Sequence, residues 1–166
     1  MTLRMCEELG FPQKGWVLED VIDLGERCYS TGEIMYESCE FCGNERIRYV
    51  HIISHSEYER YIRVGCNCAE KLTCDYVKPK IREATLRRKA GRKENFLKQR
   101  WKRTEKGNLT LKYKGKRLTI KCGKPVWSVV LNGKWINSYK GKCFSSFEIA
   151  CLAAFDLFDS QTRADG

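Results

Sequence analysis

The chain has 166 residues, of which 42% are hydrophobic and 31% are charged, so its composition is that of a folded protein with one or two small domains. Its formal net charge of +10 predicts an acidic partner, such as a nucleic acid, an anionic membrane surface or an acidic protein. The longest apolar run is too short to span a bilayer, and the first eight residues lack the apolar stretch of a secretory signal. A membrane protein and a secreted protein are therefore poor hypotheses, and a cytoplasmic location is expected.

The charge is distributed unevenly along the chain. Residues 1–77 carry 8 basic and 14 acidic side chains, whereas residues 78–103 carry 12 basic and 2 acidic side chains, and residues 104–166 carry 11 and 5. The sequence therefore predicts three parts: an N-terminal part (1–77), a basic connector (78–103) and a basic C-terminal part (104–166).

In the N-terminal part, residues 15–18 and 21–24 resemble short extended segments of an arm that caps the rest of this part. Residues 46–64 have β-branched and aromatic residues at both ends and a polar centre, which predicts a β-hairpin. Residues 66–72 then predict a short helix.

The basic connector is the strongest candidate for a long helix, over residues 80–103. Pro79 suits a first helical turn, and Leu86, Ala90, Leu97 and Trp101 fall on one helical stripe. Gly91 weakens the middle of this helix, where a kink or a break is possible.

The C-terminal part changes to a strand-like alternation over residues 109–143. Asn132-Gly133 is a strong hairpin signal, because both residues tolerate a positive φ. Ser145 to Glu148 has the pattern of a capping box that opens a final helix. The C-terminal part is therefore predicted to be a small antiparallel sheet followed by one helix.

Clustered cysteines predict a metal site. A reduced, cytosolic chain with ten cysteines uses them chiefly for metal, and Cys39-Glu-Phe-Cys42-Gly43 has the spacing of a zinc knuckle. Cys66 and Cys68 open the short helix, whose N-terminus favours thiolates. We expect these four cysteines to bind one structural Zn²⁺. Cys74, His51 or His55 could replace one of them, and a core of reduced thiols without metal is the alternative.

Knuckle, hairpin and cysteine-bearing helix together resemble the treble-clef zinc fingers. The stretches Cys39 to Gly43, Ile47 to His51 and Val64 to Leu72 are similar to a family of small uncharacterised bacterial and phage proteins with such fingers. The resemblance implies zinc and a fold but no activity. The predicted architecture is thus α+β: a treble-clef finger, a basic connecting helix, and a small antiparallel sheet backed by one C-terminal helix.

Trp127 to Leu131, Asn132 to Trp135 and Phe144 to Asp156 also resemble the APETALA-type DNA-binding domain and its phage-integrase relatives. In those domains a three-stranded sheet lies in the major groove and one helix backs it. This chain lacks their run of arginines and offers mainly lysines, which attract phosphates more readily than they read bases. Lysines that only solvate one sheet face are the alternative.

We expect largely electrostatic, non-catalytic binding of nucleic acid, DNA rather than RNA, without a small-molecule substrate. For the connector, the alternative is a solvent-exposed linker helix that only keeps the protein soluble. The candidate contacts are basic residues of the connector and the strands: Arg82, Arg87, Arg88, Lys89, Arg92, Lys93, Arg100, Lys102, Arg103, Lys116, Arg117 and Lys134.

Two other functions stay open. His51 and His55 lie four residues apart near the knuckle, as in metal-dependent nucleases of the HNH type, but the chain has no third histidine. A small inhibitor or adaptor that binds a nucleic-acid-handling protein would have a similar basic surface.

Overall fold

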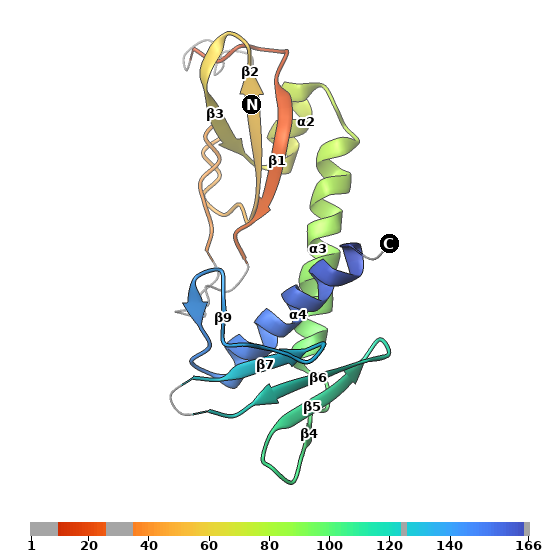
Figure 1. Cartoon of the computed structure of the whole chain (residues 1–166). Coiled ribbons are helices and arrows are strands. Elements are labelled where there is room, and N and C mark those ends of the chain that lie inside the picture. Colours follow the sequence, from red (N-terminus) through yellow and green to blue (C-terminus); the bar gives the residue numbers. More distant parts are fainter. Residues whose placement is uncertain (1–9, 26–34, 124–125, 165–166) are drawn as a thin grey trace. The chain divides into compact units, whose positions relative to one another are not determined.

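The computed structural model describes residues 10–25, 35–123 and 126–164 (Figure 1). The chain is a mixed α+β protein, as predicted, and divides into two compact units, Met1–Ala90 (unit 1) and Gly91–Gly166 (unit 2). The division falls inside one helix, whereas the sequence pattern divided the chain after residues 77 and 103. Each unit has a hydrophobic core of its own.

Unit 1 contains a three-stranded antiparallel sheet in the order β1 (Val17–Asp23), β2 (Tyr49–His55) and β3 (Tyr58–Val64). The predicted hairpin is confirmed as β2 and β3, and the expected capping arm is the edge strand β1, paired with β2. Helix α2 (Cys66–Thr73) follows β3 directly. The core is aromatic and aliphatic; its members include Phe11, Trp16, Phe41, Ile47, Val50, Ile53, Ile62, Val64 and Leu72.

Helix α3 spans Lys78–Leu97 without interruption, so Gly91 does not break it. The helix ends earlier than the predicted residue 103. Beyond it, the Trp101 ring packs edge-on against Phe96 and Phe147, and Lys102 and Arg103 form strand β4. The chain thus leaves the helix before the half-buried Trp101, which packs on these two rings.

Unit 2 contains a five-stranded antiparallel sheet in the order β4 (Lys102–Arg103), β5 (Leu109–Tyr113), β6 (Lys116–Lys121), β7 (Ser128–Leu131) and β8 (Lys134–Ile136). The tight turns before β6 and β8 consist of residue pairs with positive φ, which supports the predicted Asn-Gly hairpin. The strand-like alternation predicted up to residue 143 does not form one continuous strand after β8. The chain forms a small ribbon of β9 (Ser138–Tyr139) and β10 (Lys142–Cys143) instead.

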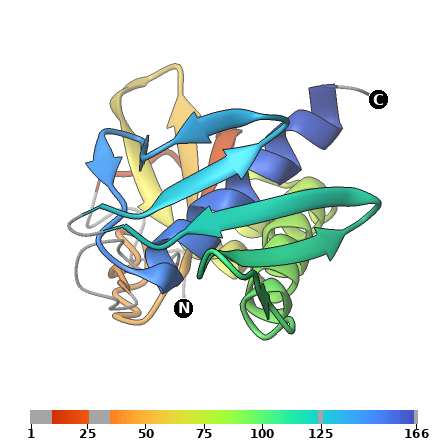
Figure 2. The same ribbon diagram turned by 60° about the horizontal axis from the view of Figure 1, so that its bottom comes forward.

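Helix α4 (Phe147–Ala164) covers one face of this sheet (Figure 2). Ser146, one residue later than the predicted cap, accepts a hydrogen bond from the backbone N–H of Ile149. Side chains of α4 and of the covered sheet face form the core together with Phe96 of α3 and Phe144, which follows β10; the members from α4 and the sheet include Leu118, Ile120, Val129, Leu131, Phe155 and Phe158. Among the described residues, none of the helices combines the length and the apolar character needed to cross a membrane.

Candidate metal centre and basic sheet face

The knuckle is a tight turn fixed by its own backbone. The N–H of Gly43 donates to the carbonyl of Cys39 at 2.8 Å, and the N–H of Cys39 donates to the carbonyl of Asn44 at 2.8 Å. Gly43 has a φ of 70°, which explains the glycine at this position. Glu40 anchors the turn to strand β3, because its carboxylate accepts from the N–H of Arg63 at 2.6 Å.

The second cysteine segment begins at the N-cap of α2, Gly65. Its N–H donates to the Sγ of Cys39 at 3.4 Å, and its carbonyl accepts from the N–H of Cys68 at 3.1 Å. The first helical turn thus carries Cys68 to the knuckle, and the positive end of the helix favours anionic sulfur there.

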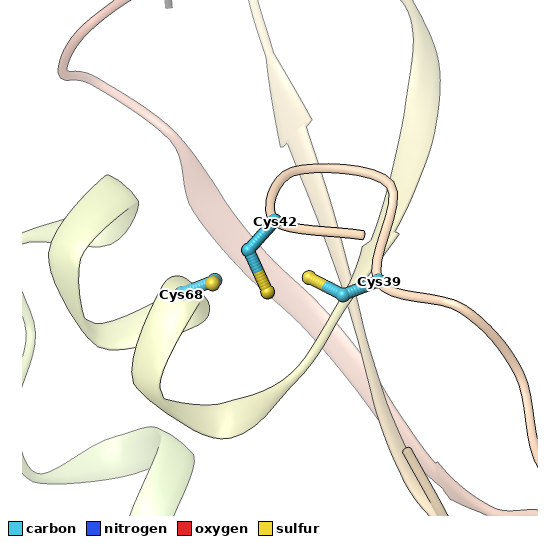
Figure 3. A group of neighbouring side chains, drawn as sticks. All are labelled: Cys39, Cys42 and Cys68. Atoms are coloured by element: carbon cyan, nitrogen blue, oxygen red, sulfur yellow. The ribbon is translucent and has the colours of Figure 1, made fainter. Parts of the chain in front are cut away.

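The sulfurs of Cys39, Cys42 and Cys68 lie within 4.8 Å of one another and point toward a common centre (Figure 3). A tetrahedral ion with bonds of about 2.3 Å to sulfur places two sulfurs about 3.8 Å apart. The spacing and the donor set therefore fit a metal ion that prefers thiolates, and these three predicted ligands are brought together.

Hydrogen bonding within the cluster favours the thiolate form of Cys39. The pKa of Cys39 is lowered to about 5, chiefly because the thiol of Cys68 hydrogen-bonds to its sulfur. Donating that hydrogen bond, together with burial, raises the pKa of Cys68. A bound cation would stabilise the second and third thiolates, which otherwise repel the first.

Cys66, the fourth predicted ligand, is not part of this cluster. Residues i and i+2 of a helix do not share a face, so Cys66 turns away from Cys68. Its sulfur lies with ligand atoms of His51 and Glu83, within 4.8 Å of each other, and 3.7 Å from a carboxylate oxygen of Glu70. Burial and the carboxylates of Glu83 and Glu70 raise the pKa of Cys66 to about 12.

The other candidate ligands also lie elsewhere. Cys74 is the exposed C-cap of α2, and His55 hydrogen-bonds to the carbonyl of Lys14 at 2.9 Å. A register shift between Ile53 and His55 interrupts the pairing of β2 with β3, and no metal-ligating group found in the described residues contains both histidines. Cys6 and Cys28 lie outside the described residues.

A pocket of about 500 Å³ lies beside the three-cysteine cluster and Cys66. Its lining includes Cys42, Cys66, Cys68 and Glu83. Three arginines also line it: Arg46, Arg48 and Arg87. Two of these are already paired, Arg48 with Asp23 at 2.8 Å and Arg87 with Glu83 at 2.6 Å.

Several of the predicted phosphate-binding residues of α3 are engaged within the protein. Arg82 donates to the carbonyl of Glu19 at 2.8 Å, Arg92 pairs with Asp159 at 3.1 Å, and Lys93 is buried against Asp156 at 2.6 Å. Lys89 is half-buried and has a partner as well. Arg88 and Arg100 are exposed.

The sheet of unit 2 presents a basic face opposite α4. Strand register places three basic residues on that face, because Lys112 pairs with Arg117, and Lys121 with Ser128, while the alternate positions Leu111, Leu118 and Ile120 are buried under the helix. Lys102 of β4 pairs with Thr110 on the same face. Trp135 pairs with Val130 there and is 60% exposed, with the ammonium of Lys121 5.1 Å from its ring centroid.

This surface was only partly predicted. Arg117 and Lys102 are among the predicted contacts, and Lys112 and Lys121 belong to the strand lysines predicted to attract phosphates. Trp135 was missed, although the strand alternation signals it. Lys116 and Lys134 lie at strand ends beside turns, on the alternate positions. Strands β4 to β8 contain no acidic residue.

Comparisons of this chain with protein-family models, curated proteins and solved structures find no match.

Proposed function

We propose that this protein is a zinc-stabilised, non-catalytic nucleic-acid-binding protein that holds DNA on the open sheet face of unit 2. The observation that carries the proposal is that face: Lys102, Lys112, Arg117 and Lys121 share it with an exposed Trp135, on strands without an acidic residue. Cations of this density neutralise phosphates and release counterions, and an indole ring offers a stacking surface.

The contacts favour the sheet over α3 as the binding surface. Arg82, Arg87 and Arg92 of α3 already have carbonyl or carboxylate partners, and giving up such an exposed pair would offset part of the gain from a phosphate contact. The exposed lysines of the sheet face suit phosphate contact more than base reading, so binding is expected to depend weakly on sequence.

The test measures affinity for duplex DNA against salt concentration. Replacing Lys112, Arg117 and Lys121 with Gln should lower the slope of log affinity against log salt by about 2 to 3, since each lost phosphate contact removes about 0.9. The matched control replaces three exposed cations outside the sheet, Arg88, Lys98 and Arg100, and should change the slope much less.

Three results would contradict the proposal. A larger effect of the control variant would move the binding surface to α3 and the segment that follows it. If the unmodified protein shows no salt-dependent binding of DNA, the DNA-binding function is contradicted and the adaptor function is favoured. Metal-dependent nicking of DNA that depends on His51 or His55 would make the protein an enzyme.

For unit 1 we propose that the ion is Zn²⁺ and that knuckle, hairpin and α2 form a treble-clef finger. Supporting this are the three thiols and the order of the elements; the described residues supply Cys39, Cys42 and Cys68 as ligands. Replacing Cys39 or Cys42 with Ser should remove the zinc bound at this cluster and unfold unit 1, as measured by elemental analysis and circular dichroism. Cys74→Ser and Cys122→Ser, at exposed thiols, should leave zinc content unchanged.

A further inference from the structure

Three elements of unit 1 bring a second set of metal-ligating side chains together. His51 comes from β2, Cys66 from α2 and Glu83 from α3, and one ligand atom of each lies within 4.8 Å of the others. None of the three belongs to the cluster of Cys39, Cys42 and Cys68. This second set joins nitrogen, sulfur and oxygen donors, a mixture suited to zinc.

His51 is a buried imidazole whose hydrogen bonding is incomplete. Its side chain is fully buried, and Nε2 lies 3.3 Å from the carbonyl of Pro79, which can only accept a hydrogen bond. That bond requires the proton on Nε2 and leaves Nδ1 bare, and Nδ1 has no hydrogen-bond partner. A buried polar atom without a partner is costly. Nε2 is the nitrogen that faces Glu83, 3.9 Å from Oε2, so an ion held between His51 and Glu83 would bind Nε2 in place of the Pro79 carbonyl.

The surroundings of Cys66 and Glu83 support a cation. The sulfur of Cys66 lies 3.7 Å from Glu70, which is itself buried, and the carboxylate of Glu83 is 3.9 Å from His51. Lys80 lies 3.1 Å from Oε1 of Glu70, the oxygen that also faces Cys66, and Arg87 binds Oε1 of Glu83 at 2.6 Å. These contacts orient the carboxylates, and the Oε2 atom of Glu83 is the one nearest to His51.

We propose that His51, Cys66 and Glu83 form a second divalent-metal site, of the zinc class, separate from the three-cysteine cluster. Cys66 and Glu83 both line the pocket of about 500 Å³, so an ion there is accessible from solvent. Three protein ligands leave one position for water or another small ligand, unlike a closed structural site. The proposal does not depend on nucleic-acid binding.

The experiment titrates the metal-free protein with Co²⁺ and follows the absorption of the cobalt–thiolate bonds. Two equivalents should bind, and the second should give about one third of the charge-transfer intensity of the first, because it has one thiolate against three. His51→Gln, Cys66→Ser and Glu83→Gln should each lose the weak-intensity equivalent and retain the other.

Matched controls exist for each variant. His55→Gln, Cys74→Ser and Glu94→Gln replace the same residue types at exposed or half-buried positions outside the set and should bind two equivalents. Circular dichroism checks the folding of each variant. If His51→Gln unfolds unit 1, the result for Glu83→Gln decides, because the side chain of Glu83 is less buried than that of His51.

Binding of a single equivalent by the unmodified protein would overturn the proposal. So would a Cys66→Ser variant that loses the high-intensity equivalent, because Cys66 would then be the fourth ligand of the three-cysteine cluster. Two equivalents in all three variants would also overturn it.

Discussion

The ammonium of Lys93 lies 2.6 Å from a carboxylate oxygen of Asp156, and both side chains are nearly inaccessible to solvent. One residue earlier, Arg92 forms a similar pair with Asp159 at 3.1 Å, but its side chain is 44% exposed. Two adjacent cations of one helix therefore have different roles. Lys93 neutralises a carboxylate buried in unit 2, whereas Arg92 forms a solvent-exposed ion pair.

This pair of neighbours allows a matched prediction. Lys93→Ala leaves the carboxylate of Asp156 buried without its ammonium partner and should reduce the free energy of unfolding of unit 2 by about 3–5 kcal/mol. Arg92→Ala should cost no more than about 1 kcal/mol, because solvent screens its ion pair. Chemical denaturation of both variants checks this, and equal losses would show that Lys93 is not the buried partner.

Cys151 is a buried thiol of α4 that no proposed site uses. Burial, followed by the charge of Glu148, raises its pKa from 9.0 to about 12. Because the folded protein keeps a proton that the unfolded chain loses above pH 9, this contribution to stability is complete below pH 9 and is lost as the pH rises toward 12.

Stability between pH 9 and pH 11 should therefore fall by about 1.4 kcal/mol per pH unit through Cys151 alone. The Cys151→Ala variant should lack this part of the decline, although its cavity lowers stability at pH 7. Denaturation of both proteins across this pH range measures the difference. Cys122→Ala, at an exposed thiol, should decline like the unmodified protein, and an identical decline in Cys151→Ala would refute the assignment.

At the scale of elements, two glycines have opposite roles. Gly91 lies in the interior of α3, where a Cβ atom would meet nothing within 4 Å. Gly133 forms the turn between β7 and β8 with a φ of 77°, a conformation that disfavours residues with a side chain.

The same substitution should consequently change stability in opposite directions. Gly91→Ala should stabilise the protein by about 0.5–1 kcal/mol, because alanine restricts the unfolded chain and favours the helix. Gly133→Ala should destabilise unit 2 by about 1–2 kcal/mol. Thermal denaturation of the two variants is the measurement, and a stabilising Gly133→Ala would contradict the turn geometry.

At the scale of the whole molecule, the two units differ in what stabilises them. The core of unit 1 includes Cys39 and Cys68, so its packing is tied to the candidate metal centre. The core of unit 2 is built from the sheet, Phe96 and α4, and contains none of the proposed metal ligands.

A chelator should therefore unfold unit 1 selectively. In hydrogen exchange, amides of β2, β3 and α2 should lose protection after metal removal, whereas amides of β6, β7 and α4 should keep it. Returning Zn²⁺ should restore the protection in unit 1. Equal loss in both units would mean that they fold as one cooperative body.

Much of the local structure could be predicted from the sequence, because its signals lie within a few residues of one another. The hairpin of residues 46–64, the helix that begins at Cys66, the turn at Asn132-Gly133 and the knuckle of Cys39 and Cys42 each depend on local backbone preferences. The excess of positive charge is likewise a property of composition, which is why an acidic partner was expected.

Tertiary structure decided which of these residues act together. The direction of α2 places Cys68 at the knuckle and Cys66 beside His51 and Glu83. His51 and Glu83 belong to other elements, β2 and α3. Packing of α3 against α4 turned Lys93 from a candidate phosphate contact into a buried partner of Asp156. Strand register gathered Lys112, Arg117 and Trp135 on one face. These outcomes depend on burial and on contacts between distant segments, and local periodicity carries no information about either.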